Sequence, residues 1–448
     1  MFPHGRSREK GVHEVKFLVV FTAMFFLALS SHAAKAAIDI TQAPYNAVPG
    51  SDSTAAFQAA ISAAGGSGGV GAIYVPGAGQ CYLLGAINAT NLATPVRIYG
   101  DGDSSCLKIT GVDTAGNWMD WSGSNMPSLE HLKVVDNGTA VPNVAILWAC
   151  TGANCSTSGI LSGFTFDHVN QSVHTRTAIF YGYGFGCVAG YRCGGGGSLN
   201  ISNSRWQELQ NGGSATDYLT GVCNAPLVLD ALNSRNIRSA YVNVTTSTAV
   251  AWRTTITNTD FVDFSAGSAR SNNCAAQFTN VNQLTMIGGS FQCVCFADLD
   301  LYSNNEGLTF IQTAFEQPDG QGAVTYHWVY ASAPAGSING ILTFISPFWS
   351  APVVGFIGLG APVIGLSVQN TDPGANSLPA PFFNSAATGC PAGISPATTW
   401  IGDADVSFLA GANTVISCGS IHNTVFRHVG PVYLPTNAVD KSDHLAID

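Results

Sequence analysis

The residues best suited to chemistry in this chain are four side chains at matching places in a repeated pattern: Arg205, Tyr241, Asp260 and Glu316. Charged residues make up only 10% of the 448 residues, so such a cluster is conspicuous. Carboxylates can exchange protons with a substrate, arginine can bind a carboxylate through two hydrogen bonds, and tyrosine can stack on a sugar or transfer a proton. We therefore treat the four as candidate catalytic residues.

The pattern that relates them is an apolar residue, a small or polar residue two positions later, and an apolar or aromatic residue three positions after that. We interpret each copy as one coil of a stacked β structure: the first and last residues face inward, and the middle one takes a tight bend where asparagines can hydrogen-bond between coils. Copies begin at Leu129, Leu161, Ile201, Ile237, Ile256, Met286, Phe310, Phe344 and Val363.

The residues beside each inward aromatic should point outward, about 5 Å from their counterparts on the next coil. Arg205, Tyr241 and Asp260 precede the aromatic and are expected on consecutive coils. The column after the aromatic contains Glu316 and three candidate substrate-binding residues, which are Asp167, Gln207 and Asn243. The alternative is an ordinary solvated face, because a slip of one residue turns every side chain over.

Residues 50–76 contain the signals that should begin the stack. Asp52 is a suitable N-cap, and Phe57 and Ile61 form an apolar stripe that predicts a helix over 53–64. A glycine run then ends the helix. Residues 72–75 read as a buried strand that Pro76 stops.

This acidic-Thr-Ala-Ala helix, glycine run and Val-Pro strand end resemble the N-terminal cap of the pectate-lyase-like superfamily of right-handed parallel β-helices. The resemblance implies an all-β fold, a single right-handed parallel β-helix or solenoid with a short N-terminal capping helix. It names no activity, because this fold carries lyases, hydrolases, epimerases, phage tailspikes and non-catalytic adhesins.

The chain divides into a leader and one domain. Residues 1–36 combine a basic start, an apolar run over 17–29 and an Ala-x-Ala cleavage signal, and predict a signal peptide rather than a membrane anchor. Residues 37–370 are expected to form the β-helix, and 371–448 its last coils and C-terminal cap. We therefore expect a secreted, periplasmic or extracellular protein without membrane insertion after cleavage.

Charge limits the partners. Residues 1–36 hold five of the 17 Lys and Arg and two of the 27 Asp and Glu, which leaves the mature chain a net charge of −13. Binding to nucleic acid or to an anionic membrane is thereby disfavoured. A polysaccharide is the expected partner, and the oligomeric state stays open.

The 12 cysteines all follow the leader, and an even number in an exported chain predicts disulfides rather than zinc. Cys293 and Cys295 should share one face of a strand, so each is expected to pair elsewhere. The candidate local pairs are Cys150 with Cys155, Cys187 with Cys193, and Cys390 with Cys418.

Two short motifs resemble those of known enzymes. Asn258-Thr259-Asp260 is similar to the Asn-Thr-Asp motif of polygalacturonases, but that family's Asp-Asp pair, Gly-His-Gly and Arg-x-Lys are missing, so the resemblance extends only to Asp260. Asp167 and His168 resemble the Asp-His pair of pectate lyases without that family's downstream arginine motif.

No cofactor is required by any motif, although calcium is possible. Asp298 and Asp300 are two residues apart, and both point outward if Leu299 and Leu301 point inward, so they could hold Ca²⁺. The alternative is a solvated strand face.

Two classes of function fit these observations. The first is a secreted enzyme that cleaves a polysaccharide in a groove along the β-helix, by β-elimination if calcium or arginine neutralises a uronate, or otherwise by glycoside hydrolysis. The second is a non-catalytic adhesin, surface protein or glycan-binding protein, which the absence of a complete catalytic motif favours. A phage-like depolymerase is a third possibility, against which the leader counts.

Overall fold

The computed structural model describes the part of the chain listed at the end of this paragraph. The chain divides into two units, Met1–Ala37 and Ile38–Asp448, and the elements below belong to the second. Among the described residues, no helix is long and apolar enough to cross a membrane. The described ranges are 36–124, 126–139, 141–149, 164–175, 177–182, 198–209, 227–230, 253–263, 270–279, 281–293, 295–301, 305–316, 327–331, 339–349, 355–359, 363–371, 383–384, 400–402, 405–415, 420–422, 424–433 and 445–447.

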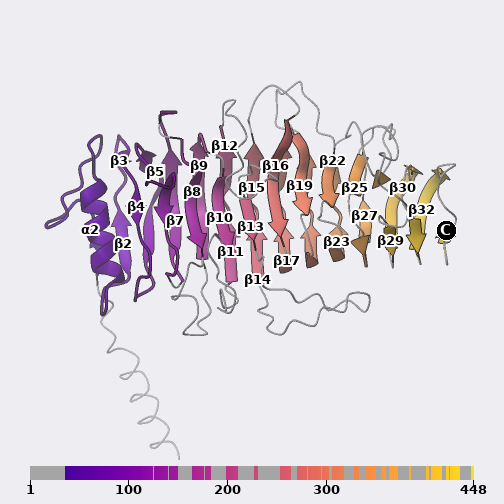
Figure 1. Cartoon of the computed structure of the whole chain (residues 1–448), viewed down its shortest axis with the longest axis horizontal. Helices are drawn as coiled ribbons and strands as arrows, with labels where there is room; N and C mark the ends of the chain where they lie inside the picture. The colour runs from indigo at the N-terminus through magenta and orange to yellow at the C-terminus, as the bar shows by residue number, and fades with distance from the viewer. Residues whose placement is uncertain are drawn as a thin grey trace, which may run out of the picture. The chain divides into compact units, whose positions relative to one another are not determined.

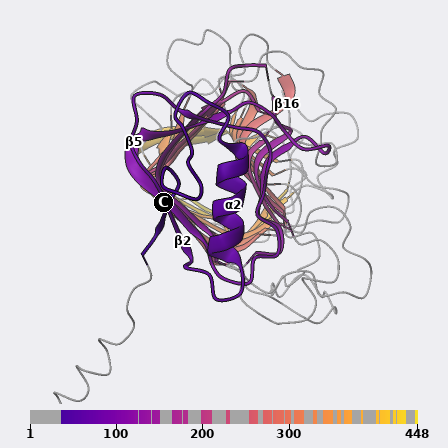
Figure 2. The same ribbon diagram turned by 90° about the vertical axis from the view of Figure 1, so that its left-hand side faces the viewer.

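The described helix, α2 (Thr54–Gly65), lies at that end of the stack of strands where the chain begins (Figure 2). Phe57 and Ile61 are buried on its inner face, as the apolar stripe predicts. Ser53 rather than Asp52 is the N-cap residue, but the Asp52 carboxylate accepts a hydrogen bond from the Thr54 amide at 3.0 Å. The expected helix and the strand that follows it are confirmed, with that one-residue shift of the cap.

The strands form two sheets, and neighbouring strands in each sheet pair in parallel (Figure 1). The larger sheet contains β1 (Ile38–Asp39), β2 (Ala72–Val75), β3 (Tyr82–Leu84), β5 (Arg97–Ile109), β7 (Ser128–Val135), β9 (Phe164–Val173), β11 (Ser198–Ser202), β12 (Arg205–Glu208), β14 (Arg253–Thr257), β15 (Asp260–Asp263), β17 (Asn282–Ile287), β18 (Ser290–Cys293), β20 (Glu306–Ile311), β21 (Ala314–Glu316), β23 (Asn339–Ile345), β24 (Phe348–Trp349), β26 (Val363–Ile364), β27 (Ser367–Thr371), β29 (Trp400–Gly402), β30 (Asp405–Val415), β31 (Ser420–His422), β32 (Thr424–Tyr433) and β33 (Leu445–Ile447). The smaller sheet contains β4 (Ile87–Asn88), β6 (Asn117–Asp120), β8 (Val144–Ala149), β10 (Thr177–Gly182), β13 (Leu227–Asp230), β16 (Arg270–Thr279), β19 (Cys295–Leu301), β22 (His327–Ala331), β25 (Gly355–Leu359) and β28 (Phe383–Asn384).

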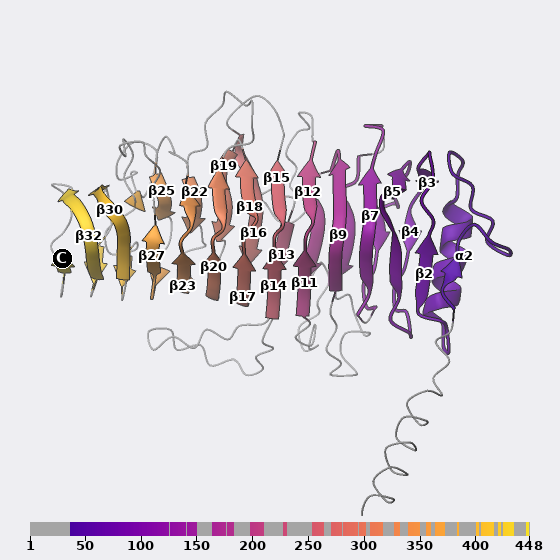
Figure 3. The same cartoon turned by 180° about the vertical axis from the view of Figure 1, so that it is seen from behind.

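The chain alternates regularly between the sheets. From β14 to β25, two strands of the larger sheet are followed by one of the smaller, and each strand pairs with its counterpart in the next unit (Figure 3). This three-strand unit corresponds to the coil expected from the sequence pattern. The C-terminal strands β29 to β33 extend the larger sheet.

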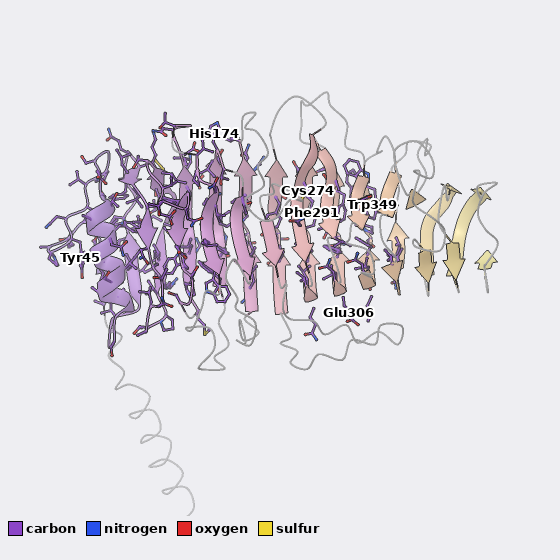
Figure 4. All side chains as sticks on the ribbon, viewed as in Figure 1. Tyr45, His174, Cys274, Phe291, Glu306 and Trp349 are labelled. Atoms are coloured by element: carbon purple, nitrogen blue, oxygen red, sulfur yellow. A yellow bond between two sulfur atoms is a disulfide. The ribbon has the colours of Figure 1, made fainter. Side chains whose placement is uncertain are left out.

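Two rows of buried side chains cross successive units, as the pattern predicts. The first row pairs Ile201, Ile256, Met286, Phe310 and Phe344 in order. The second row, which we call the aromatic row, is Trp206, Phe261, Phe291, Phe315 and Trp349. Phe291 and Trp349 are labelled in Figure 4. All ten are at most 1% exposed, so these rows form the core between the sheets.

Bends in the larger sheet, which lie within β7 and β9 and between the two strands of each later coil, form a second regular feature, the bend ladder. Each bend residue has a positive φ between 45° and 65°, a region that disfavours bulky side chains but accepts Gly, Asn and His more readily. Asn258 Nδ2 donates to Asn203 Oδ1 at 3.5 Å, as expected for stacked asparagines. The ladder consists of His131, His168, Asn203, Asn258, Gly288, Gln312 and Ser346.

The register that the pattern predicts is wrong at two of its copies. Phe166, not Leu161, pairs with both Leu129 and Ile201, so the bend is at His168 rather than Gly163. At the other copy, Val368 pairs with Phe344, while Val363 pairs with Asn339. Apolar residues satisfy the loose pattern in either register, and only the strand pairing separates the choices. The expected bend at Ser239 lies outside the described residues.

A disulfide joins Cys81, the residue before β3, to Cys106 in β5, and these two strands pair in parallel. Cys274 and Cys293 each belong to a disulfide as well. That Cys293 does not pair with Cys295 stays a prediction. The three candidate pairs, Cys150 with Cys155, Cys187 with Cys193 and Cys390 with Cys418, lie outside the described residues.

Candidate functional site

An open groove of about 490 Å³ runs across the first four rungs of the bend ladder. Strands β5, β7, β9, β12 and β15 supply its walls, so the residues that meet there are far apart in the sequence. Its polar lining includes two carboxylates, one arginine and two histidines. The lining residues are Gly102, Asp103, His131, His168, Val169, Asn170, Asn203, Ser204, Arg205, Asn258 and Asp260.

Two of the candidate catalytic residues lie together in this groove. Arg205 pairs with Asp260, which pairs with Ser290 on the following coil. Asp260 therefore lies on the coil that pairs directly with the coil of Arg205. The expected coil through Tyr241 does not separate the two residues. Tyr241 and Asn243 themselves lie outside the described residues.

A chain of side-chain hydrogen bonds leads from the groove towards Glu316. The Ser290 hydroxyl donates to Asp260 Oδ1 at 2.7 Å. Gln292 Nε2 donates to Ser290 Oγ and to Glu316 Oε1, both at 2.9 Å. Gln207 pairs with Val262, Val262 with Gln292, and Gln292 with Glu316, so these residues form one column as expected, except that Gln207 is followed by Val262 and not by Asn243. Glu316 does not itself line the groove.

Asp167 is not in that column. It pairs with Glu130 and Ser202, on the other side of the bend from Gln207, because the register of this coil differs from the expected one. The Asp167 carboxylate instead lies beside two bend residues: Oδ1 is 3.0 Å from His168 Nδ1, and Oδ2 is 3.9 Å from His131 Nε2. The expected placement of Asp167 with Gln207 is therefore wrong.

The surroundings of Asp167 favour its ionised form. Partial burial raises the pKa of this carboxyl, but hydrogen bonds from Ser202, His168 and Asn203 outweigh the burial and lower the pKa below its usual value. Ser202 Oγ donates to Oδ1 at 2.7 Å and Asn203 Nδ2 at 3.2 Å. The carboxylate is thus held in a fixed orientation.

His131 and His168 were missed as functional residues, because isolated histidines in a sequence are usually surface residues. Their rings stack with centroids 4.7 Å apart, since both occupy successive rungs of the bend ladder. The signal that could have found them is the bend position itself, but it requires the coil at Phe166 in its correct register.

The possible calcium ligands are not on a solvated face. Leu299 and Leu301 point into the core as expected, but Asp298 is 0% and Asp300 4% exposed. Gln277 Nε2 donates to Asp300 Oδ2 at 3.0 Å. Alternation along a strand fixes which side a residue is on, not whether that side is covered. The expected exposure of the pair is wrong, and the possible binding of Ca²⁺ stays an untested expectation.

Asp298 leads to a prediction about stability. Neither carboxyl oxygen makes a hydrogen bond of ordinary geometry within the described residues. Burial, and then the charge of Glu316, raise the pKa of Asp298 well above its usual value, which the nearby amides of Cys293 and Glu316 only partly oppose. The group is therefore protonated in the folded protein at pH values where it ionises in the unfolded chain.

Because the folded pKa is raised, the free energy of unfolding should fall as the pH rises from the unfolded pKa towards the folded one, by up to about 1.4 kcal/mol per pH unit. The neutral Asp298→Asn variant lacks this term, so we expect its unfolding free energy to depend less on pH. Denaturant titrations of both proteins between acidic and neutral pH measure the difference. Parallel curves would contradict the assignment.

Comparison with known proteins assigns no family. No family model matches the chain, and no curated protein matches it. Solved structures similar to it include the catalytic unit of a GH87 α-1,3-glucanase from Streptomyces thermodiastaticus, at 12% identity, with 92% of this chain and 68% of that chain covered and a TM-score of 0.39. A tailspike protein of E. coli bacteriophage HK620 in complex with a pentasaccharide has 12% identity, coverages of 92% and 78%, and a TM-score of 0.40. The mannuronan C-5 epimerase A-module of Azotobacter vinelandii has 10% identity, coverages of 92% and 100%, and a TM-score of 0.36. With these low TM-scores, the similarities carry no assignment of activity to this chain.

Proposed function

We propose that the chain forms a right-handed parallel β-helix that binds a polysaccharide in the groove over the bend ladder and cleaves it there. The observation that carries the proposal is the row of polar side chains on successive coils, in which Arg205 and Asp260 are paired neighbours in one open groove. Such a groove suits an extended polymer, because equivalent positions repeat about every 5 Å along the stack.

The groove supplies groups for both binding and proton transfer. The Arg205 side chain is exposed and can pair with a carboxylate or hydroxyl of a sugar. Asp260 is the candidate acid or base, and Ser290 holds one of its oxygens. His131 and His168, whose rings stack on each other, also line the groove.

A pair of carboxyl groups linked across neighbouring coils suits hydrolysis. The hydrogen bonds through Ser290 and Gln292 limit the distance between Asp260 Oδ1 and Glu316 Oε1 to at most about 8.5 Å, an upper limit that is compatible with the separations of roughly 6.5–9.5 Å in inverting glycosidases and about 5–5.5 Å in retaining ones. In this proposal one carboxyl protonates the leaving oxygen and the other activates water. Substrate entry would then have to displace Gln292 from between them.

A test is incubation with a panel of neutral and uronate-containing polysaccharides, with and without Ca²⁺. New reducing ends without the ultraviolet absorbance of unsaturated sugars support hydrolysis. Unsaturated products would instead establish β-elimination and leave only cleavage standing. Glycans recovered intact from a stable complex would reject cleavage in favour of the non-catalytic binding protein, a role that the fully hydrogen-bonded Asp260–Glu316 network also fits.

A further inference from the structure

Among the described residues, one cluster of histidine and carboxylate side chains outside the Arg205–Asp260 pair brings its potential ligand atoms close together. We propose that His131, Asp167 and His168 form a binding site for a divalent transition metal such as Zn²⁺ at the wall of the groove. The three residues each offer one ligand atom, and these atoms all lie within 4.8 Å of one another. Metal binding at this site does not depend on the proposed cleavage of polysaccharide.

The distances are close to those a metal needs. Ligand atoms at 2.0–2.1 Å from a tetrahedral Zn²⁺ are about 3.3 Å from one another. Here Asp167 Oδ1 is 3.0 Å from His168 Nδ1, and Asp167 Oδ2 is 3.9 Å from His131 Nε2. Small side-chain rotations are therefore enough to bring one carboxylate oxygen and two imidazole nitrogens around a single ion.

The backbone already holds the two imidazoles together. His131 and His168 have φ values of 53° and 50°, on consecutive rungs of the bend ladder. Their Cα atoms are kept one coil apart by the parallel pairing of β7 with β9, in which Leu129 pairs with Phe166 and Leu132 with Val169. The stacked rings are thus fixed by the fold rather than by a flexible loop, so little order has to be created on binding.

The carboxylate has the outer hydrogen bonds that metal ligands usually have. Ser202 Oγ and Asn203 Nδ2 both donate to Asp167 Oδ1, at 2.7 and 3.2 Å. Such bonds orient a ligating group and keep it ionised, and their loss in known sites weakens metal binding by about 10–100-fold.

The donor set selects the metal. Two imidazoles and one carboxylate suit Zn²⁺ and neighbouring transition metals, whereas Ca²⁺ takes six to eight oxygen ligands. Three protein ligands leave a coordination position for water or substrate. Both histidines line the groove, with side chains 43% and 51% exposed, so a sugar hydroxyl or carboxylate could fill that position.

The test is calorimetric titration of the chelator-treated full-length protein with Zn²⁺, and separately with Ca²⁺. We expect Zn²⁺ to bind at this site and Ca²⁺ to give no heat from it. His131→Asn and His168→Asn should each weaken zinc binding by about 100-fold or more, beyond the loss typical of an outer-shell change. Asparagine is a suitable replacement because it occupies the same bend at Asn203 and Asn258.

Gln312→Asn is the matched control. Gln312 is an exposed rung of the same ladder, with a φ of 51°, but it does not line the groove. The affinity of the Gln312→Asn protein for Zn²⁺ should equal that of the wild type. Circular dichroism should show the same fold in all variants. A wild type that binds no Zn²⁺ would overturn the proposal. Zinc binding that survives both histidine replacements would also overturn it, since other histidines would then account for the binding.

Discussion

Replacement of Asp260 by asparagine is expected to reduce the rate of polysaccharide cleavage by about 10²–10⁴-fold, the usual contribution of a positioned acid or base. Asparagine has nearly the same size, and its carbonyl oxygen can still accept the hydrogen bond from the Ser290 hydroxyl. It cannot exchange a proton with a leaving group or with water. The measurement is kcat/KM from new reducing ends, on a glycan that the wild type cleaves.

Asp120→Asn is the control for this experiment. Asp120 lies on β6 of the smaller sheet, where its carboxylate accepts from the Ser122 amide at 2.8 Å, and it does not line the groove. We expect this variant to keep the wild-type rate. If Asp260→Asn cleaves as fast as Asp120→Asn, then Asp260 is not the acid or base, even if the groove still binds the glycan.

The second large effect concerns stability. Phe315→Ala is expected to lower the free energy of unfolding by about 3–5 kcal/mol, because it removes a fully buried ring and leaves a cavity in the aromatic row. The ring centroid of Phe315 lies 5.6 Å from that of Phe291, 6.0 Å from that of Phe344 and 4.7 Å from that of Trp349. Rings on the coils before and after that of Phe315 thus lose contacts together.

Phe348→Ala provides the comparison, because Phe348 lies on the neighbouring coil but is 52% exposed. A surface replacement of this kind usually changes stability by no more than about 0.5 kcal/mol. Denaturant unfolding of both variants, followed by circular dichroism, measures the difference. Equal losses in the two would show that the aromatic row is not the part of the core that holds the coils together.

The core of the fold could be predicted because its physics is local. In a strand, alternate residues face opposite sides, so Ile256 and Phe261 had to face inward if Asn258 made the bend between them. The pattern therefore identified Ile201 and Trp206, which pair with Ile256 and Phe261, and it placed Arg205 and Asp260 in one column, although it expected a coil through Tyr241 between them. These relations depend only on a few consecutive residues in each coil.

The predictions that were wrong depend on the length of each coil and on what covers the outer face of a sheet. Between Leu129 and Phe166 the chain makes one coil, but Leu161 satisfied the same loose pattern, and this placed Asp167 in the wrong column. The histidine pair could not be recognised without that register. Asp298 was correctly placed on the outer side of its strand, yet it is fully buried, since alternation does not reveal what lies over a sheet.

The bend ladder separates the shape of the backbone from the identity of the side chain. The same left-handed turn is made by His, Asn, Gly, Gln and Ser at different rungs. The conformational cost, about 1–2 kcal/mol for most residues with a Cβ atom, is set mainly by the turn, and it is lower for Asn and His than for bulky side chains. Single substitutions at these rungs can therefore exchange one binding chemistry for another along the groove while the strands on either side stay in place, which makes the ladder a natural place for related chains to diverge in ligand and for new sites to be grafted.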